Sequence, residues 1–256
     1  DLRNISGLMM VTCKMIVNDM KNQMDPTQFG NRKGVSIQHY LVKMLDRIIC
    51  ALDKNAKGEA VAVIATMIDW RQAFPRQCPT LAIKSFIRNG VRPALIPILM
   101  SFFENRRMSV KWRSVMSVTK RLKGEGPQGS TKGVLSYMSQ SNNNADCVPE
   151  ENRFKYFDDA TVLEVINLLN IGLSSYKVRE RIPSNIPEHN QFIQGQHLKS
   201  QQYLNLINKW TEENLMALNE KKTKSIIFNF SKKHKFTTDI LLKNQRIEIV
   251  EKAKHK

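Results

Sequence analysis

The stretch Tyr156-Phe157-Asp158-Asp159 constrains the fold of this chain more than any other. It lies inside a mostly apolar run from Phe154 to Leu163, so the pattern predicts a strand, a tight turn and a second strand. Adjacent side chains of a regular strand point to opposite faces, whereas both carboxylates can approach one point on the turn of a hairpin. Two neighbouring carboxylates repel each other, and a divalent metal ion relieves that repulsion. An ordinary surface turn is the alternative, because Asp is a common turn residue.

A second acidic residue, Asp69, ends a long apolar run that begins at Ala60. The β-branched residues of this run and its single polar interruption, Thr66, predict a strand that is buried on both faces. Asp69 then lies where the strand leaves the core. A third carboxylate from a neighbouring strand would complete a site for two ions, since each Mg²⁺ takes only one or two protein carboxylates. A solvated acid at a strand end is the alternative.

Residues 124–130 read Gly-Glu-Gly-Pro-Gln-Gly-Ser. Three glycines and a proline in seven residues exclude regular structure and allow the backbone to approach a ligand closely. Ser130 is a suitable N-cap for a helix that includes Val134 to Met138. A loop of this kind is weak evidence alone, but its place between the other two motifs is specific.

These three pieces, in this order, resemble a known family. Asp69 to Phe74 (Asp-x₄-Phe), Gly126 to Ser130 and Tyr156 to Asp159 look like motifs A, B and C of reverse transcriptases.

Further segments extend the resemblance over nearly the whole chain. Asp25 to Gly30, followed by Lys33 to Ser36, is similar to the fingers motif of the non-LTR retrotransposon branch. Asp1 to Ser6 is similar to the Arg-Pro-Ile-Ser element ahead of it, with Asn4 where Pro is usual. Leu218 to Lys224 resembles motif D.

The resemblance implies a site for two Mg²⁺ (or Mn²⁺) ions. Asp69 and Asp158 would bind the metal directly, Asp159 would be the supporting carboxylate, and the backbone carbonyl of Trp70 would be a further ligand. A metal ion lowers the pKa of the primer 3′-hydroxyl for in-line attack, and a second ion neutralises charge on the departing pyrophosphate. Lys222 best matches the lysine that protonates pyrophosphate, with Lys221 and Lys224 as close alternatives.

The resemblance also implies contacts with the incoming deoxynucleotide. Phe74 would lie below its sugar, and Gln128 with Gly129 would lie against the nucleotide and the template. Arg3, with Arg32 or Lys33, would reach the triphosphate. Phe74 as a simple core residue is the alternative.

The order of expected elements predicts an α+β fold with an antiparallel sheet packed on helices. By resemblance this is a polymerase palm with fingers, and the thumb is missing or incomplete. Expected divisions are 1–58 for part of the fingers, 59–105 for the palm with motif A, 106–123 for basic strands, 124–235 for the palm with motifs B, C and D, and 236–256 for the start of a C-terminal hairpin. Because the chain begins at Asp1, we expect a fragment of a longer open reading frame.

Local patterns place the individual elements. Helices are expected from Ser36 to Leu52, from Pro79 to Gly90, through Leu95 to Phe103 with a start or kink at Pro97, and from Leu198 to Leu215. A strand is expected from Lys224 to Phe230, and a hairpin from Ile240 to Val250.

The formal net charge of +17 indicates a polyanionic partner, here an RNA or DNA template with its primer. Basic residues cluster between Glu104 and Glu125 on what we expect to be two strands with one basic face. The expected nucleic-acid-binding residues are Arg106, Arg107, Lys111, Arg113, Lys120, Arg121 and Lys123. A merely solvated charged face is the alternative.

The four cysteines share no close spacing, so the sequence predicts free thiols in a reducing, intracellular compartment and no zinc site. No apolar run approaches the ~20 residues of a membrane span.

Three departures from the family pattern are Pro75 where Asp is common, Lys132 inside the motif B helix, and Ala160 after the Asp pair. They keep open a decayed or domesticated nucleic-acid-binding domain without catalysis. An RNA-directed RNA polymerase is less favoured, because such enzymes usually carry an acid at the position of Phe74.

Overall fold

The computed structural model describes residues 2–57, 59–122, 130–169, 190–193, 198–231 and 235–250. The chain divides into two compact units, each assembled from separate stretches. Unit 1 comprises Asp1–Asp25, Gln72–Asn144 and Glu212–Ala217, and unit 2 comprises Pro26–Arg71, Ala145–Thr211 and Leu218–Lys256. The architecture is α+β with a mainly antiparallel main sheet, as the sequence predicts.

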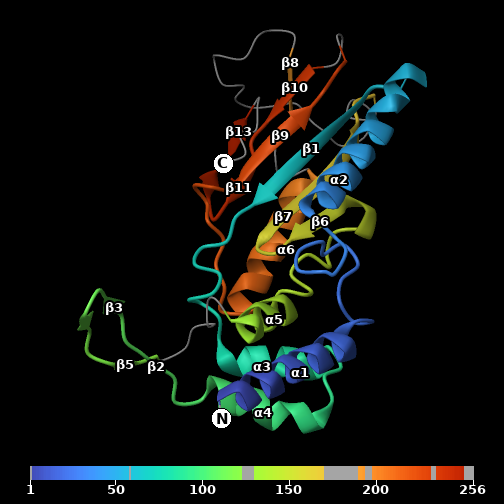
Figure 1. Ribbon diagram of the computed structural model, residues 1–256. Coiled ribbons are helices and arrows are strands. Elements are labelled where there is room, and N and C mark those ends of the chain that lie inside the picture. The colour runs from blue at the N-terminus through green and yellow to red at the C-terminus, as the bar shows by residue number, and fades with distance from the viewer. Residues whose placement is uncertain are drawn as a thin grey trace. The chain divides into compact units, whose positions relative to one another are not determined.

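Unit 2 is built around a five-stranded sheet with the order β13-β9-β1-β7-β6 (Figure 1). The elements are α2 (Ile37–Leu52), η1 (Asp53–Lys57), β1 (Val61–Ile68), η3 (Glu150–Asn152), β6 (Arg153–Tyr156), β7 (Asp159–Asn167), β8 (Asn190–Ile193), α6 (Lys199–Glu213, its last two residues in unit 1), β9 (Lys224–Phe228), β10 (Lys235–Thr238), β11 (Leu241–Leu242), β12 (Gln245–Arg246) and β13 (Glu248–Val250). The prediction of a doubly buried strand is confirmed, because all but one residue of β1 are buried.

Two helices cover opposite faces of this sheet. The hydroxyl of Tyr40, on α2, lies 2.8 Å from the hydroxyl of Thr161 on β7. On the other face, Glu164 of β7 accepts hydrogen bonds from the backbone N–H groups of Lys199 (3.0 Å) and Ser200 (2.8 Å) at the start of α6. Because Thr161 and Glu164 are three residues apart, they point to opposite sides of the strand. The carboxylate of Glu164 also satisfies the free N–H groups at that helix end.

Unit 1 is mainly helical. Its elements are α1 (Leu2–Met20), α3 (Pro79–Arg88), η2 (Pro93–Leu95), α4 (Ile96–Phe103), β2 (Arg107–Met108), β3 (Lys111–Trp112), β4 (Val115–Met116), β5 (Lys120–Arg121) and α5 (Thr131–Gln140). The core joins the four helices α1, α3, α4 and α5 and the connection between α3 and α4, through Cys13, Ile16, Met20, Phe86, Val91, Leu95, Leu99 and Leu135.

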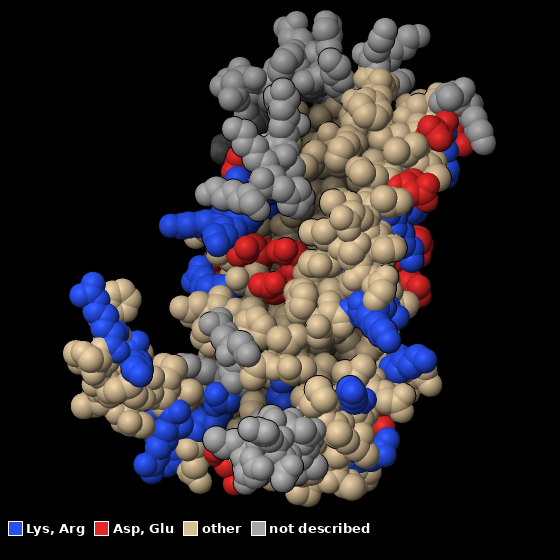
Figure 2. Space-filling model, viewed as in Figure 1, with Lys and Arg blue, Asp and Glu red and all other residues tan. Residues whose placement is uncertain are grey.

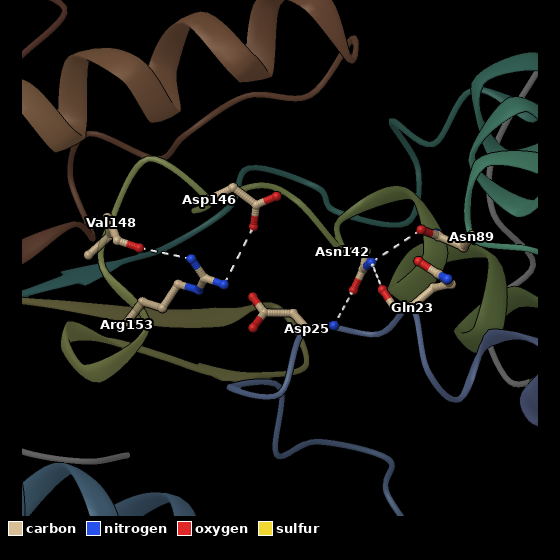
Figure 3. A network of polar contacts seen from close by, with 7 residues as sticks. All are labelled: Gln23, Asp25, Asn89, Asn142, Asp146, Val148 and Arg153. Carbon is tan, nitrogen blue, oxygen red and sulfur yellow. Dashed lines mark hydrogen bonds and ion pairs between the residues drawn. The ribbon is translucent and has the colours of Figure 1, made fainter.

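Asn142, just after α5, fixes the end of that helix within unit 1 (Figure 3). Its amide donates to the backbone carbonyl of Gln23 (2.7 Å) and to the side-chain oxygen of Asn89 (3.2 Å), and its side-chain oxygen accepts from the N–H of Asp25 (2.7 Å). Asn89 in turn donates to the carbonyl of Ser139 (2.9 Å). One side chain thus connects α5 to the chain after α1 and after α3.

Most expected helices and caps are confirmed. α2 begins after Ser36, whose hydroxyl lies 3.0 Å from His39 Nδ1 in a capping box. Pro79 starts α3, Pro97 stands in the first turn of α4, and the Ser130 hydroxyl accepts from the N–H of Gly133 at 3.0 Å to cap α5. Gly90, with φ of +82°, follows α3 and adopts a conformation that favours glycine.

Two features differ from expectation. Helix α1 was not predicted, although Cys13, Ile16 and Met20 recur at helical spacing and are buried. The expected hairpin over residues 240–250 is wrong in its second half. β11 and β12 do form a hairpin around Lys243-Asn244, but β13 pairs in parallel with β9. Pairing with a distant strand decides that arrangement, and a local pattern carries no signal for it.

Candidate active site

The acidic hairpin, defined as β6, the turn and β7, presents the Asp pair. Tyr156 pairs with Asp159, which leaves Phe157 and Asp158 as a two-residue turn. Phe157 has φ of +58°, a conformation that hindered side chains avoid and that costs about 1 to 3 kcal/mol. Asp158 and Asp159 are exposed. The sequence prediction of strand, turn and strand is therefore confirmed, and the turn is strained at the residue before Asp158.

The β1–β7 register brings Asp69 to the same end of the sheet. Met67 pairs with Thr161 and Ile68 with Ala160. Continued by one residue, this register aligns Asp69 with Asp159. Asp69 directly follows β1 and Asp159 begins β7, so acidic residues separated by 90 positions in sequence lie at the same end of the paired strands.

The backbone around Asp69 is fixed by the segment before β9. The carbonyl of Asp69 accepts from the N–H of Asn219 at 2.8 Å, and its own N–H donates to the Thr223 hydroxyl at 3.3 Å. Trp70 forms an isolated antiparallel bridge with Leu218, and its ring lies 5.8 Å from that of Trp210, edge to face. These contacts hold the strand end that carries Asp69 in place. The segment that makes them includes the residues that resemble motif D.

One carboxylate oxygen of Asp69, Oδ2, is buried and has no hydrogen-bond partner among the described residues. A buried charged oxygen is costly unless a donor or a cation serves it. This observation fits a divalent ion bound by Asp69. In the described part of the chain, no cluster of three or more His, Cys, Asp or Glu side chains has an arrangement that could hold a metal. Mg²⁺ typically completes its shell with waters and substrate phosphates, so fewer protein carboxylates suffice.

Charges of both signs lie close to these acids within unit 2. Arg71 and Lys243 contact Glu220 at 2.7 and 3.2 Å. A hydrogen bond from its own backbone N–H lowers the pKa of the Glu220 carboxyl, and the two cations lower it further. In Figure 2, Asp and Glu side chains gather near the middle of the viewed face, and others are scattered along its edges.

The three candidate lysines of the segment before β9 have different surroundings. Lys224 forms an ion pair with Glu248 at 2.8 Å. Lys221 and Lys222 are exposed. Lys224 is thus occupied by a structural contact, and the proposed role of Lys222 in proton transfer stays a prediction.

The segment from Pro26 to Gly30 lies along the edge of the acidic hairpin. Lys155 donates its N–H to the carbonyl of Thr27 at 3.0 Å, and the N–H of Phe29 donates to the carbonyl of Lys155 at 2.8 Å. The Arg32 guanidinium donates to the carbonyls of Pro26 (3.1 Å) and Gln28 (3.4 Å), whereas Lys33 is exposed. Arg32 therefore braces this segment.

The remaining predicted nucleotide contacts fall in unit 1 or outside the described residues. Phe74 lies in unit 1, where its ring packs on the buried Tyr137 of α5 with a centroid distance of 5.2 Å. Gln128 and Gly129 lie outside the described residues, as does the side chain of Arg3, whose backbone belongs to α1. The expected roles of Gln128, Gly129 and Arg3 are therefore not tested by any contact.

The predicted basic strands form a hairpin in unit 1, which we call the basic hairpin (residues 106–122). β3 and β4 pair around a turn at Arg113, and β2 pairs with β5 so that Arg107 faces Arg121 directly. Like charges opposed in this way destabilise a strand pair. Apolar side chains are exposed as well, with Trp112 73% exposed and Val118 76%. Figure 2 shows Lys and Arg side chains along the basic hairpin. The last predicted basic residue, Lys123, lies outside the described residues.

Lys132, which departs from the family pattern by placing a charge inside the motif B helix, is buried in unit 1. Its ammonium lies 5.0 Å from the ring centroid of Phe102, a cation–π arrangement. Tertiary packing thus accommodates a residue that the family pattern does not include.

Three residues of unit 2 with a part in this site carried no sequence signal of their own. Gln28 contacts the acidic turn, Thr223 bonds Asp69, and Tyr40 bonds the strand that begins with Asp159. Burial raises the pKa of the Tyr40 hydroxyl, and the charge of Asp159 raises it further. Gln28 and Thr223 lie in stretches that resembled family motifs, but nothing in that resemblance gives their contacts.

The four cysteines form no disulfide. None of the described helices is both long enough and apolar enough to cross a membrane.

No protein-family model matches this chain, and no curated protein matches its sequence. Among solved structures, it is similar to one described as apo telomerase from Candida tropicalis truncated from the C-terminal domain, with 13% identity and a TM-score of 0.49. The match covers 90% of this chain and 41% of that chain, so this chain spans less than half of the matched one. Similarity of this degree carries no functional argument.

Proposed function

We propose that this chain is a reverse transcriptase domain of the non-LTR retrotransposon type, which adds deoxynucleotides to a primer 3′-hydroxyl on a nucleic-acid template. The observation that carries the proposal is the β1–β7 register, which puts Asp69 and Asp159 at the same end of the paired strands, next to the turn of Phe157 and Asp158. The buried, unpartnered Oδ2 of Asp69 supports a cation at this point.

We assign each residue of the site a part in this reaction. A pair of Mg²⁺ ions held at this site would supply activation of the primer hydroxyl and neutralisation of charge on the leaving pyrophosphate. Asp69 and Asp158 would hold them, and Asp159 would support the site by its charge. Thr223 and Asn219 fix the backbone of Asp69, and Lys222 would donate the proton to pyrophosphate. The protein thus acts by positioning and electrostatics.

The basic hairpin supports a nucleic-acid partner. A net charge of +17 and directly opposed arginines favour a polyanion that neutralises them. Exposed Trp112 offers a flat surface on which a base can stack. We therefore assign template and primer binding to this hairpin.

A second candidate function is nucleic-acid binding without catalysis. The absence of a three-residue metal cluster among the described side chains favours it, and it shares the basic hairpin with the first proposal. An RNA-directed RNA polymerase is the third candidate function. The preference for deoxynucleotides or ribonucleotides, described below, separates it from the reverse transcriptase.

A Mg²⁺-dependent primer-extension assay on an RNA template tests the proposal directly. We expect extension with deoxynucleotides that stops when a chelator is added and returns with excess Mg²⁺ or Mn²⁺. Binding of the template–primer without any extension, in either metal, would reject the enzyme and leave the binding protein.

A further inference from the structure

We propose that Gln28 is a positioning residue that clamps the turn of the acidic hairpin and so sets the place of Asp158. The consequence for catalysis rests on the proposed function, but the clamp itself does not. All residues of the clamp belong to unit 2.

The side-chain amide of Gln28 contacts both backbone polar groups of Phe157. Its Oε1 accepts from the N–H of Phe157 at 3.0 Å, and its Nε2 donates to the carbonyl of Phe157 at 3.3 Å. The same Oε1 also accepts from the N–H of Gly30 at 2.9 Å. Gln28 is 3% exposed, so water does not compete freely for these bonds. Buried polar contacts of this kind specify one conformation, because leaving them unmade is costly.

The turn needs such support because Phe157 has φ of +58°. A glycine adopts this conformation without strain, whereas an aromatic residue holds it only if its surroundings over-determine it. Gln28 meets the N–H and the carbonyl of the strained residue at once, as a neighbouring strand would. A parallel bridge between Gln28 and Lys155 places the amide at the turn.

The lack of a side chain at Gly30 explains how the segment from Pro26 to Gly30 can lie so close to Phe157. A Cβ atom at this position would lie 2.5 Å from the backbone nitrogen of Phe157 and 2.8 Å from a carbon of its ring. Both distances are too short for any side chain unless the turn moves. Gln28 and Gly30 thus act together: one holds the turn by hydrogen bonds, and the other permits the contact.

Asp158 follows Phe157 directly, so a shift of the clamped residue displaces the carboxylate. A misplacement of about 1 Å in a reacting site can cost on the order of a hundredfold in rate. The clamp therefore lets the segment before α2 control the metal-binding geometry without touching the metal.

The chain contains a matched control. Gln201, on α6, makes the same double contact with the backbone of Leu241: its Nε2 donates to the carbonyl at 2.8 Å, and its Oε1 accepts from the N–H at 2.7 Å. Gln201 is 7% exposed and belongs to the same unit. Loss of either amide removes a pair of bonds to one residue's backbone and a third bond, to Gly30 for Gln28 and to Asn205 for Gln201, but only Gln28 serves the acidic turn.

The experiment compares Gln28→Leu with Gln201→Leu in the full chain. Hydrogen exchange of the Phe157 amide should accelerate about tenfold in the first variant and not in the second. Mn²⁺ binding, followed by electron paramagnetic resonance, should weaken in Gln28→Leu alone. Primer extension should lose on the order of a hundredfold in kcat with little change in KM for the template–primer. Similar thermal melts of the two variants would show that stability does not explain the difference.

Gln28→Glu and Gly30→Ala provide milder changes in case Gln28→Leu does not fold. Glu keeps the acceptor for both N–H groups but loses the donor to the Phe157 carbonyl, and protonation of the acid restores a donor. Its extension defect should therefore diminish as pH falls. Gly30→Ala should reproduce the loss of Mn²⁺ binding. Unchanged exchange at Phe157 in every Gln28 variant that folds would overturn the clamp.

Failure of the clamp and failure of the proposed function remain distinct. If the wild-type chain extends no primer, the enzyme is rejected, while the exchange of the Phe157 amide still decides the clamp. If the wild-type chain extends primers and Gln28→Leu extends them equally well, the clamp is rejected and the enzyme stands.

Discussion

The two hairpins of this molecule are built in opposite ways. In the acidic hairpin, β6 and β7 belong to a five-stranded sheet, and the strained turn is bonded to a buried glutamine. In the basic hairpin, strands of two residues pair only with one another, all eight strand residues are exposed, and arginines face each other. Under the proposed function, the acidic turn must fix a carboxylate to within fractions of an ångström and so needs a rigid support. A surface that neutralises a flexible polyanion does not, because electrostatic attraction tolerates small displacements.

The difference predicts that substitutions in the acidic hairpin impair primer extension, whereas substitutions in the basic hairpin impair binding of the template–primer. Asp158→Asn should abolish primer extension, by roughly a thousandfold or more, because a neutral amide keeps the shape but no longer attracts the metal. Affinity for the template–primer should change little, since phosphate contacts come from Lys and Arg. Extension and filter binding measure the two effects. Asp46→Asn, the same change on the exposed face of α2, is the control. Equal loss of binding and extension would mean that Asp158 serves folding.

Phe74 tests whether a residue of unit 1 decides which sugar is used. If its ring fills the space of a 2′-hydroxyl, Phe74→Ala should improve ribonucleotide use about tenfold to a thousandfold relative to deoxynucleotide use. Single-nucleotide incorporation gives the ratio of kcat/KM values.

The packing of Phe74 on Tyr137 also allows a purely structural role. Phe86→Ala, at a fully buried site of the same unit, is the packing control and should lower the Tm without changing the sugar ratio. If Phe74→Ala behaves like this control, Phe74 is a core residue. The hypothesis of an RNA-directed RNA polymerase is then favoured more than before.

The basic hairpin should show the converse of Asp158. Replacing Arg107 and Arg121 together by Ala should weaken template–primer binding about tenfold at moderate salt and reduce the slope of log K against log salt by up to about two. Turnover at saturating template should stay close to that of the wild type. Lys84→Ala with Arg88→Ala, on α3, removes the same charge from exposed helical positions. An identical loss in this pair would mean that net charge, not the hairpin, binds the nucleic acid.

The smallest effect concerns the ion pairs beside Asp69. Because the folded-state pKa of Glu220 is lowered, its stabilising contribution is present above the unfolded value of about 4.3 and is lost as pH falls through the folded value. Its partners are half-exposed, so Glu220→Gln should cost no more than about 1 kcal/mol at neutral pH. Melts from pH 7 to pH 3 should show this cost disappear. Exposed Glu59→Gln is the control, and a difference that persists at pH 3 would exclude an ionic origin.

Local sequence patterns determined the elements that carry the site. The β-branched run before Asp69 could bury both faces only as an inner strand, and Ser36, Pro79 and Ser130 start helices by their own chemistry. The strand–turn–strand pattern around the Asp pair followed from hydrophobicity alone. These features depend on neighbours within a few residues, so the sequence contains enough information to predict them.

Tertiary structure alone decided how these elements cooperate. The placement of Asp69 and Asp159 at the same end of the sheet depends on the register between β1 and β7, which no local pattern encodes. The Gln28 amide reaches Phe157 across 129 positions, and Gly30 is required only because that turn lies against it. β13 likewise joins β9 in parallel instead of completing the expected hairpin. Burial, register and backbone approach are properties of pairs of distant segments, and such pairs exist only once the chain has folded.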